Sequence, residues 1–212
     1  MKKFAMILLA VLCAASLSPA AGKLAFGVKA GMTGANMTTV GDDVPWSAKW
    51  GITGGAFVCF SLSDIFAVQA EILYSPKGAK YSLSDGTTTL NATVTAPYID
   101  VPLLLKVFLP TGLSEGVRPV VFAGPYIGFK AGTGRFTTDI IYSGQHDPHE
   151  YPLTNLKGTD FGFVLGAGIE IPLATLKIVL DARWGTSLST ISTEGDDTKN
   201  KAWTFLLGIS FN

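Results

Sequence analysis

The sequence has few charged residues and almost no cysteine. Charged residues make up 15% of its 212 positions, and one of its two cysteines, Cys13, lies in an apolar N-terminal stretch. Cys59 is then the single cysteine downstream, which excludes an intramolecular disulfide there. The 16 basic and 16 acidic residues leave no basic surplus. This balance argues against nucleic acid as a partner.

A long apolar run is missing after the N-terminus. A membrane-spanning helix needs about 20 consecutive apolar residues, and charges, glycines or prolines interrupt every stretch after residue 20. At the N-terminus, Lys2 and Lys3 precede an apolar stretch over residues 4–15 and small residues at 18 and 20. This pattern is typical of an export signal, with a retained anchor as the alternative. We predict a signal peptide over residues 1–20 and one domain over residues 21–212.

Alternation of apolar and polar residues recurs along the rest of the chain. Runs with period two predict β-strands that have one apolar face. They occupy residues 24–33, 49–60, 66–75, 98–109, 118–131, 160–171, 178–188 and 203–211. No helix signal lies between the runs, so neither βαβ units nor a second domain is expected.

The connections between the runs differ in length. Short connections fall at residues 61–64, 110–116 and 172–175, and long ones at residues 34–45, 76–93, 132–157 and 189–201. The long ones are rich in Gly, Asp, Asn, Ser and Thr, which favour loops. Short turns at one end and long loops at the other predict an all-β fold, an eight-stranded antiparallel up-and-down transmembrane β-barrel with both termini on the short-turn side.

The apolar face decides between a membrane barrel and a soluble one. The apolar positions of all eight runs carry no Asp, Glu, Lys or Arg, whereas a charge facing lipid would cost about 2–4 kcal/mol at the midplane. A soluble lipocalin-type barrel, the alternative, would turn the charged face to water. We expect the apolar face to contact lipid in the outer membrane. Trp50, Tyr74, Trp184 and Trp203 lie near the loop-side strand ends, where an interfacial aromatic girdle belongs.

The polar face is then expected to line the lumen, which side chains just fill in a barrel of eight strands. It carries both signs of charge in a predicted lumen network of Lys29, Glu71, Asp100, Lys106, Arg118, Lys130, Asp160, Glu170, Asp181 and Arg183. We expect ion pairs there, with Asp181 beside Arg183 and Glu71 beside Lys106 or Arg118. Glycines on the same face give the larger side chains room, and Cys59 faces the interior as a small residue.

Several segments resemble one family over essentially the whole mature chain. They read GVKAGMTGANM, AVQAEILYSPKGAKY, APYIDVPLLLKVF, VFAGPYIGFKAG, DFGFVLGAGIEI and LDARWGTSLSTIS. Together they resemble the PorT-like outer-membrane β-barrels common in Bacteroidetes, small barrels of the OmpA and OmpX type. The resemblance implies a Gram-negative outer membrane and an envelope or secretion-associated role. It marks strands and turns and not a chemical site, so the secretion role of the family's namesake is not carried over.

The loop expected over residues 132–157 holds the residues that could carry chemistry. His146 and His149, with Asp147 and Glu150, have a spacing that could hold a metal, and Ser143 could pair with either histidine in a lipid-modifying enzyme. A solvated loop is the preferred interpretation, so we predict no catalytic, cofactor or metal site.

Tyr142, His146, His149 and Tyr151 are instead the expected contact with a partner. The partners expected are outer-membrane lipids and envelope or secretion proteins, with no nucleic acid, and the barrel is expected to be a monomer. A narrow channel for small solutes stays open as an alternative, beside the enzyme.

Overall fold

The computed structural model describes residues 23–39, 46–110, 116–193 and 198–211, so the predicted signal peptide lies outside the described residues. The described residues form ten strands: β1 (Leu24–Thr39), β2 (Ser47–Ser61), β3 (Phe66–Ser84), β4 (Thr88–Phe108), β5 (Arg118–Lys130), β6 (Gly134–Tyr142), β7 (Gln145–Leu153), β8 (Thr159–Pro172), β9 (Leu176–Ser187) and β10 (Thr198–Phe211). None of the described segments is a helix that is long and apolar enough to cross a membrane.

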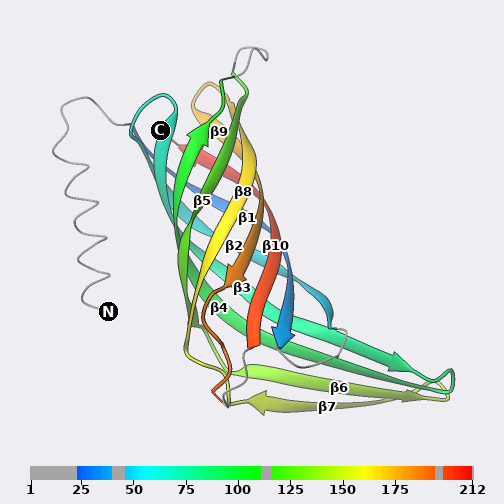
Figure 1. Ribbon diagram of the computed structural model, residues 1–212. Coiled ribbons are helices and arrows are strands. Elements are labelled where there is room, and N and C mark those ends of the chain that lie inside the picture. The colour runs from blue at the N-terminus through cyan, green and yellow to red at the C-terminus, as the bar shows by residue number, and fades with distance from the viewer. Residues whose placement is uncertain (1–22, 40–45, 111–115, 194–197, 212) are drawn as a thin grey trace.

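Eight of these strands close into a ring (Figure 1). Each of β1, β2, β3, β4, β5, β8, β9 and β10 pairs antiparallel with the next, and β10 pairs back onto β1. Phe26 lies opposite Phe211, so the start of β1 and the end of β10 lie at the same rim of the barrel. The predicted eight-stranded antiparallel barrel is confirmed.

The outer wall of the barrel is apolar on every strand. Many of the large outward side chains are 38–77% exposed, among them Phe26, Ile52, Ile72, Leu105 and Leu207. Their strand neighbours point into the lumen because side chains alternate across a sheet. Trp50, Tyr74 and Trp203 stand on the outer face, and Trp184 is half-buried there. An apolar outward band of this kind is favourable in contact with lipid and unfavourable in contact with water.

The prediction of a loop over residues 76–93 is wrong. β3 continues to Ser84 and β4 starts at Thr88, and the two strands pair without interruption from Lys77–Ala96 to Ser84–Thr89. Only three residues turn the chain. The loops expected over residues 34–45 and 189–201 are also shorter than predicted, because β1 runs to Thr39 and β10 starts at Thr198.

The loop predicted over residues 132–157 is a β-hairpin. β6 pairs with the outer part of β4, from Thr88–Tyr142 to Thr95–Arg135, and β7 pairs with β6. Ser143 and Gly144 turn the hairpin with φ values of 49° and 78°, as a two-residue type I′ turn requires. β7 is the last strand of this sheet in the described chain.

The outward face changes chemistry where the hairpins leave the barrel. Up to Pro76 on β3 and from Pro97 on β4 the outward positions are apolar. Beyond these prolines the same face carries Lys80, Ser82, Ser84, Thr89, Asn91, Thr93 and Thr95. Lipid contact therefore ends at the two prolines. Residues 80–95 and 134–153, here called the arm, form a four-stranded sheet that projects from the loop side of the barrel (Figure 1).

Candidate functional site

The centre of the lumen holds a charge-balanced cluster of four residues. The carboxylate of Glu71 accepts hydrogen bonds from Arg183 Nη1 at 2.6 Å and from Lys29 Nζ at 3.0 Å. Asp181 accepts from Arg183 Nη2 at 2.9 Å and also from Lys29. All four side chains are at most 5% exposed. Two cations and two carboxylates so close together balance one another's charge, which buried charges require.

A second buried pair lies nearer the short-turn rim. Lys106 Nζ donates to Glu170 at 2.5 Å and to the amide oxygen of Gln69 at 3.1 Å. The amide nitrogen of Gln69 donates to Glu71, so this glutamine joins the two clusters. Glu71 was expected to pair with Lys106 or Arg118. This prediction is wrong, because its partners are Lys29 and Arg183. The network otherwise contains Asp181 beside Arg183, as expected.

A third cluster lies toward the loop side and depends on a residue that the sequence did not single out. Lys77 Nζ is 2.8 Å from Asp160 and 2.8 Å from Asp100. It also lies over the rings of Tyr98 and Tyr126 at 4.7 and 4.6 Å from their centroids. The Tyr126 hydroxyl donates to Asp160 at 3.1 Å. Lys77 sits in the stretch expected to be a loop, but its place in the inward register of β3 makes it a lumen residue.

Two predicted members of the network lie at its ends, half-buried. Arg118 Nη2 donates to the carbonyl of Asp64 in the β2–β3 turn at 2.6 Å, and its guanidinium stacks over Phe108 at 4.1 Å. Lys130 Nζ donates to the carbonyl of Leu156 at 3.1 Å. These cations therefore tie turns and loops to the rims, while the other eight predicted residues belong to the three buried clusters.

Glycines opposite aromatic residues let the lumen close. Gly162 lies across from Tyr126 and Gly166 across from Phe122 in the β5–β8 pair. A Cβ atom at Gly162 would stand 2.4 Å from the Tyr126 ring, and one at Gly166 2.5 Å from the Phe122 ring. Each ring thus fills the space that its glycine leaves, and the expected role of lumen glycines is confirmed at these positions.

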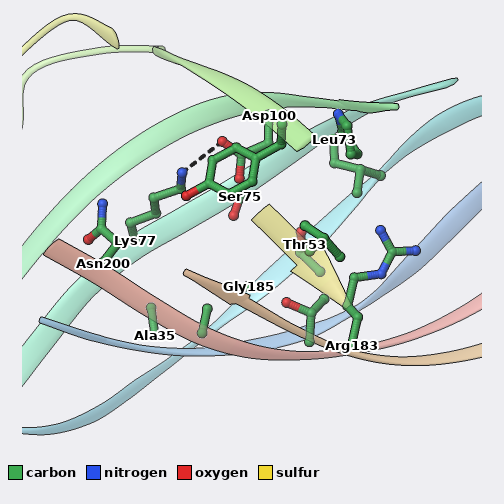
Figure 2. A pocket seen from close by; sticks show the side chains of 14 residues that line it. Ala35, Thr53, Leu73, Ser75, Lys77, Asp100, Arg183, Gly185 and Asn200 are labelled. Atoms are coloured by element: carbon green, nitrogen blue, oxygen red, sulfur yellow. Dashed lines mark ion pairs between the residues drawn. The ribbon is translucent and has the colours of Figure 1, made fainter. Parts of the chain in front are cut away.

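Apolar layers lie above and below the charged clusters. Met37, Ala79 and Ile191 form a buried group on the loop side, packed against Trp46, Val94 and Leu156. A larger group lies around and below the Lys106–Glu170 pair and contains Cys59, Ala67, Leu104, Phe108, Phe122 and Val179. A cavity of about 60 Å³ remains between the central and loop-side clusters. Figure 2 shows Lys77 directed at Asp100 on one side of this cavity and Arg183 on the other.

The arm has two faces of opposite character. Register places Tyr142, His149 and Tyr151 on the face that continues the lumen side, together with Ile140 and Leu83. Tyr142 is 60% exposed and Tyr151 is 51% exposed. Three of the four residues predicted to contact a partner therefore share one exposed face, which we call the inner face. It is rich in aromatic and aliphatic side chains and also carries Asp147 and Gln145.

His146 lies on the opposite, polar face. Its Nδ1 is 2.8 Å from a carboxylate oxygen of Asp139. The same face carries Arg135 and Glu150, whose side chains form an exposed ion pair at 3.3 Å. His146 is thus separated by the sheet from the other three residues expected to contact a partner.

A family model described as an outer membrane protein beta-barrel domain matches residues 14–193 of the sequence. The chain belongs to this outer-membrane β-barrel family. The location predicted from the apolar band, the outer membrane, is confirmed. No curated protein matches the sequence.

Solved structures similar to this outer-membrane barrel have low sequence identity. The attachment invasion locus protein Ail of Yersinia pestis is 14% identical, with 88% of this chain and 98% of Ail covered and a TM-score of 0.41. Neisserial surface protein A is 13% identical, with 88% and 97% covered and a TM-score of 0.45. The outer membrane protein OprG from Pseudomonas aeruginosa is 11% identical, with 90% and 96% covered and a TM-score of 0.45.

The histidines of this outer-membrane barrel do not converge on one point. His146 and His149 differ by an odd number of positions on β7, so they point to opposite faces. His149 stacks on Tyr151, and Ser143 lies in the turn at the hairpin tip. Within the described residues, no group of three or more His, Cys, Asp or Glu side chains is placed to hold a metal ion.

The tip of the β3–β4 hairpin is fixed by a carboxylate. The backbone N–H groups of Thr88 and Thr87 donate to Asp85 Oδ1 at 2.7 and 2.9 Å. These hydrogen bonds stabilise the charged form and hold the pKa of Asp85 below its usual value. Gly86 completes the turn with a φ of 89°. The arm thus ends in an ordered tip.

Proposed function

We propose that this outer-membrane barrel is a closed, non-catalytic module of the bacterial envelope, related to the PorT-like barrels of Bacteroidetes. In this proposal it binds an envelope or secretion protein through the inner face of its arm. The observation that carries the proposal is the contrast between the two parts of the molecule. The barrel interior is filled with ion-paired side chains and packed rings, while the arm stands outside the lipid band with exposed aromatic residues.

The filled lumen supports a scaffold in preference to a narrow channel. A conducting path would have to open the Lys29–Glu71–Arg183 cluster, and separating buried charges from their partners is costly. The cavity of about 60 Å³ is on the scale of a few water molecules. Planar-bilayer recordings of the purified barrel are expected to show no steady conductance, and steady open pores would instead establish the channel.

The inner face of the arm supports partner binding. Leu83, Ile140, Tyr142 and Tyr151 are each more than 40% exposed on it. Tyrosines and aliphatic residues gathered on one exposed sheet are more typical of interaction sites than of solvated surfaces. The opposite face provides a built-in comparison because it is polar and lies on the same strands.

The test is co-purification from native outer membranes after cross-linking. Replacing residues 134–153 by a short turn is expected to remove the captured partner, as is the double variant Tyr142→Ser with Tyr151→Ser. His146→Ala, on the polar face, is the matched control and is expected to retain the partner. Heat-modifiable migration on gels checks that each barrel is folded. An unchanged set of captured proteins in both inner-face variants would refute the proposed role of the arm.

The enzyme alternative has its own experiment. A lipid-modifying activity that uses His146 or His149 would change the lipid or lipopolysaccharide profile when either is replaced by alanine. The positions of these histidines on opposite faces support the non-catalytic role, and we expect unaltered profiles.

A further inference from the structure

The lipid-facing wall contains a groove over β1, β10, β9 and β8. Its volume is about 680 Å³. Ala30, Ala167 and Ala182 lie in it as outward side chains that end at Cβ, so the wall is thin there. Trp50 and Phe205 stand at one side with rings stacked at 6.4 Å and an interplanar angle of 20°. The groove is a hollow between small and large apolar residues.

The groove lies entirely within the lipid band. Register places Met32, Phe205, Ala182 and Ala167 in one row of outward positions, and Ala30, Leu207, Leu180 and Ile169 in the next. None of these side chains has a polar atom able to form a hydrogen bond, so a polar ligand would lose its bonds to water on entry. The outer membrane is where this face resides, and hydrocarbon is the material that surrounds it.

The shape of the groove separates a lipid chain from a second copy of the barrel. Trp50 and Leu207 are 52% and 56% exposed and project beside the alanines. A second barrel has a convex wall, which would rest on these projecting side chains and leave the floor uncovered. A single hydrocarbon chain is narrow enough to lie between them, and its methylenes gain dispersion contacts with the alanine floor.

We propose that this groove binds an acyl chain of an outer-leaflet lipid, with Trp50 at the headgroup end. Trp50 is near the loop-side end of β2, and that side of such barrels faces the cell exterior. Tryptophan is enriched at this level because its ring is apolar and its indole N–H reaches the interface. The chain then extends past Ala30 toward Leu180 and Ile169. The barrel carries this lipid as a bound component and not only as solvent.

The test uses fluorescence quenching by lipids brominated along the acyl chain. One variant keeps Trp50 as its single tryptophan, with Trp46, Trp184 and Trp203 replaced by phenylalanine. A matched variant keeps Trp203 instead, which is also lipid-facing, pairs with the same residue, Gly34, and lies outside the groove. In vesicles with increasing fractions of brominated phosphatidylcholine, Trp50 is expected to be quenched more strongly than Trp203 at each fraction, because a chain held in the groove keeps its bromines close to the indole ring.

Filling the groove gives the decisive comparison. Ala30→Leu keeps an apolar outward side chain but occupies the floor, so it is expected to abolish the difference between the two tryptophans. Val121→Leu, on the lipid face of β5 away from the groove, is expected to preserve the difference. Heat-modifiable migration confirms folding in each case, and Ala182→Leu repeats the test at the far end of the floor.

Two results would overturn the proposal. Equal quenching of Trp50 and Trp203 in the unfilled barrel would show that the groove holds no chain in preference to the rest of the wall. A change from dimer to monomer caused by Ala30→Leu, measured as particle mass in nanodiscs and without an effect on quenching, would show that a second copy occupies the groove.

Discussion

Replacing Glu71 by glutamine tests whether the lumen is held together by balanced charge. Glu71→Gln conserves shape but leaves Arg183 and Lys29 to share one remaining carboxylate, Asp181. Breaking one partner out of a buried ion cluster costs about 3–5 kcal/mol. Because both cations keep a contact to Asp181, we expect a loss of about 3 kcal/mol, at the lower end of that range.

The assay is equilibrium unfolding by urea of the barrel refolded into lipid vesicles, followed by tryptophan fluorescence. Glu150→Gln is the control, since Glu150 forms an exposed ion pair on the arm and its loss should cost less than about 1 kcal/mol. Adding Arg183→Met to Glu71→Gln restores neutrality, because Lys29 and Asp181 remain, and should recover most of the lost stability. Equal costs for Glu71→Gln and Glu150→Gln would refute the reasoning, as would additive losses in the double variant.

Three further outcomes follow from the structure. Gly185→Ala should stabilise the barrel by about 0.5–1 kcal/mol, because a Cβ there meets no atom closer than 3.8 Å and lies beside the lumen cavity. Gly166→Ala should destabilise it in the same urea assay, because the added Cβ would strike the Phe122 ring. Acidification should loosen the tip of the arm, because the pKa of Asp85 is lower in the folded protein than in the unfolded chain. The stability that its hydrogen bonds contribute is present above the unfolded pKa and is lost as the pH falls through the folded pKa. The amide chemical shift of Thr88, measured by NMR, should follow this titration, and Asp85→Asn should remove it.

The barrel could be predicted from the sequence because contact with lipid requires an apolar side chain at every outward position. Each strand within the band must present apolar side chains to one side, so period two is visible in runs such as residues 203–211 without knowledge of their neighbours. The lumen charges could be named for the same reason, as the residues that alternate with that face.

The strands of the arm were missed because outward side chains no longer need to be apolar outside the membrane. From Lys80 to Thr95 the outward face is polar, so the composition resembles a loop although the strand pairing continues. Two signals were nevertheless present. Thr, Ile and Tyr between residues 136 and 142 favour a strand, and Ser143–Gly144 is suited to a two-residue turn.

The partners within the lumen could not be derived from the sequence. Glu71 meets Lys29 and Arg183 across separations of 42 and 112 positions. Such contacts depend on the register of every strand between them and on the closure of the ring, which no local pattern encodes. Lys77 was missed for a related reason, since it follows Pro76 at the point where the apolar outward face ends.

The two prolines of β7 limit strand pairing between neighbouring copies of the barrel at a crowded cell surface. The two-residue turn makes Tyr142 and Gln145 the first hydrogen-bonded pair, so alternation leaves Pro148 and Pro152 at positions whose missing N–H groups would have pointed away from β6. A neighbouring strand approaching this border would find carbonyl groups but lack half of the donors that it needs. The β7 edge of the projecting sheet is therefore a poor template for pairing with a strand of an adjacent copy.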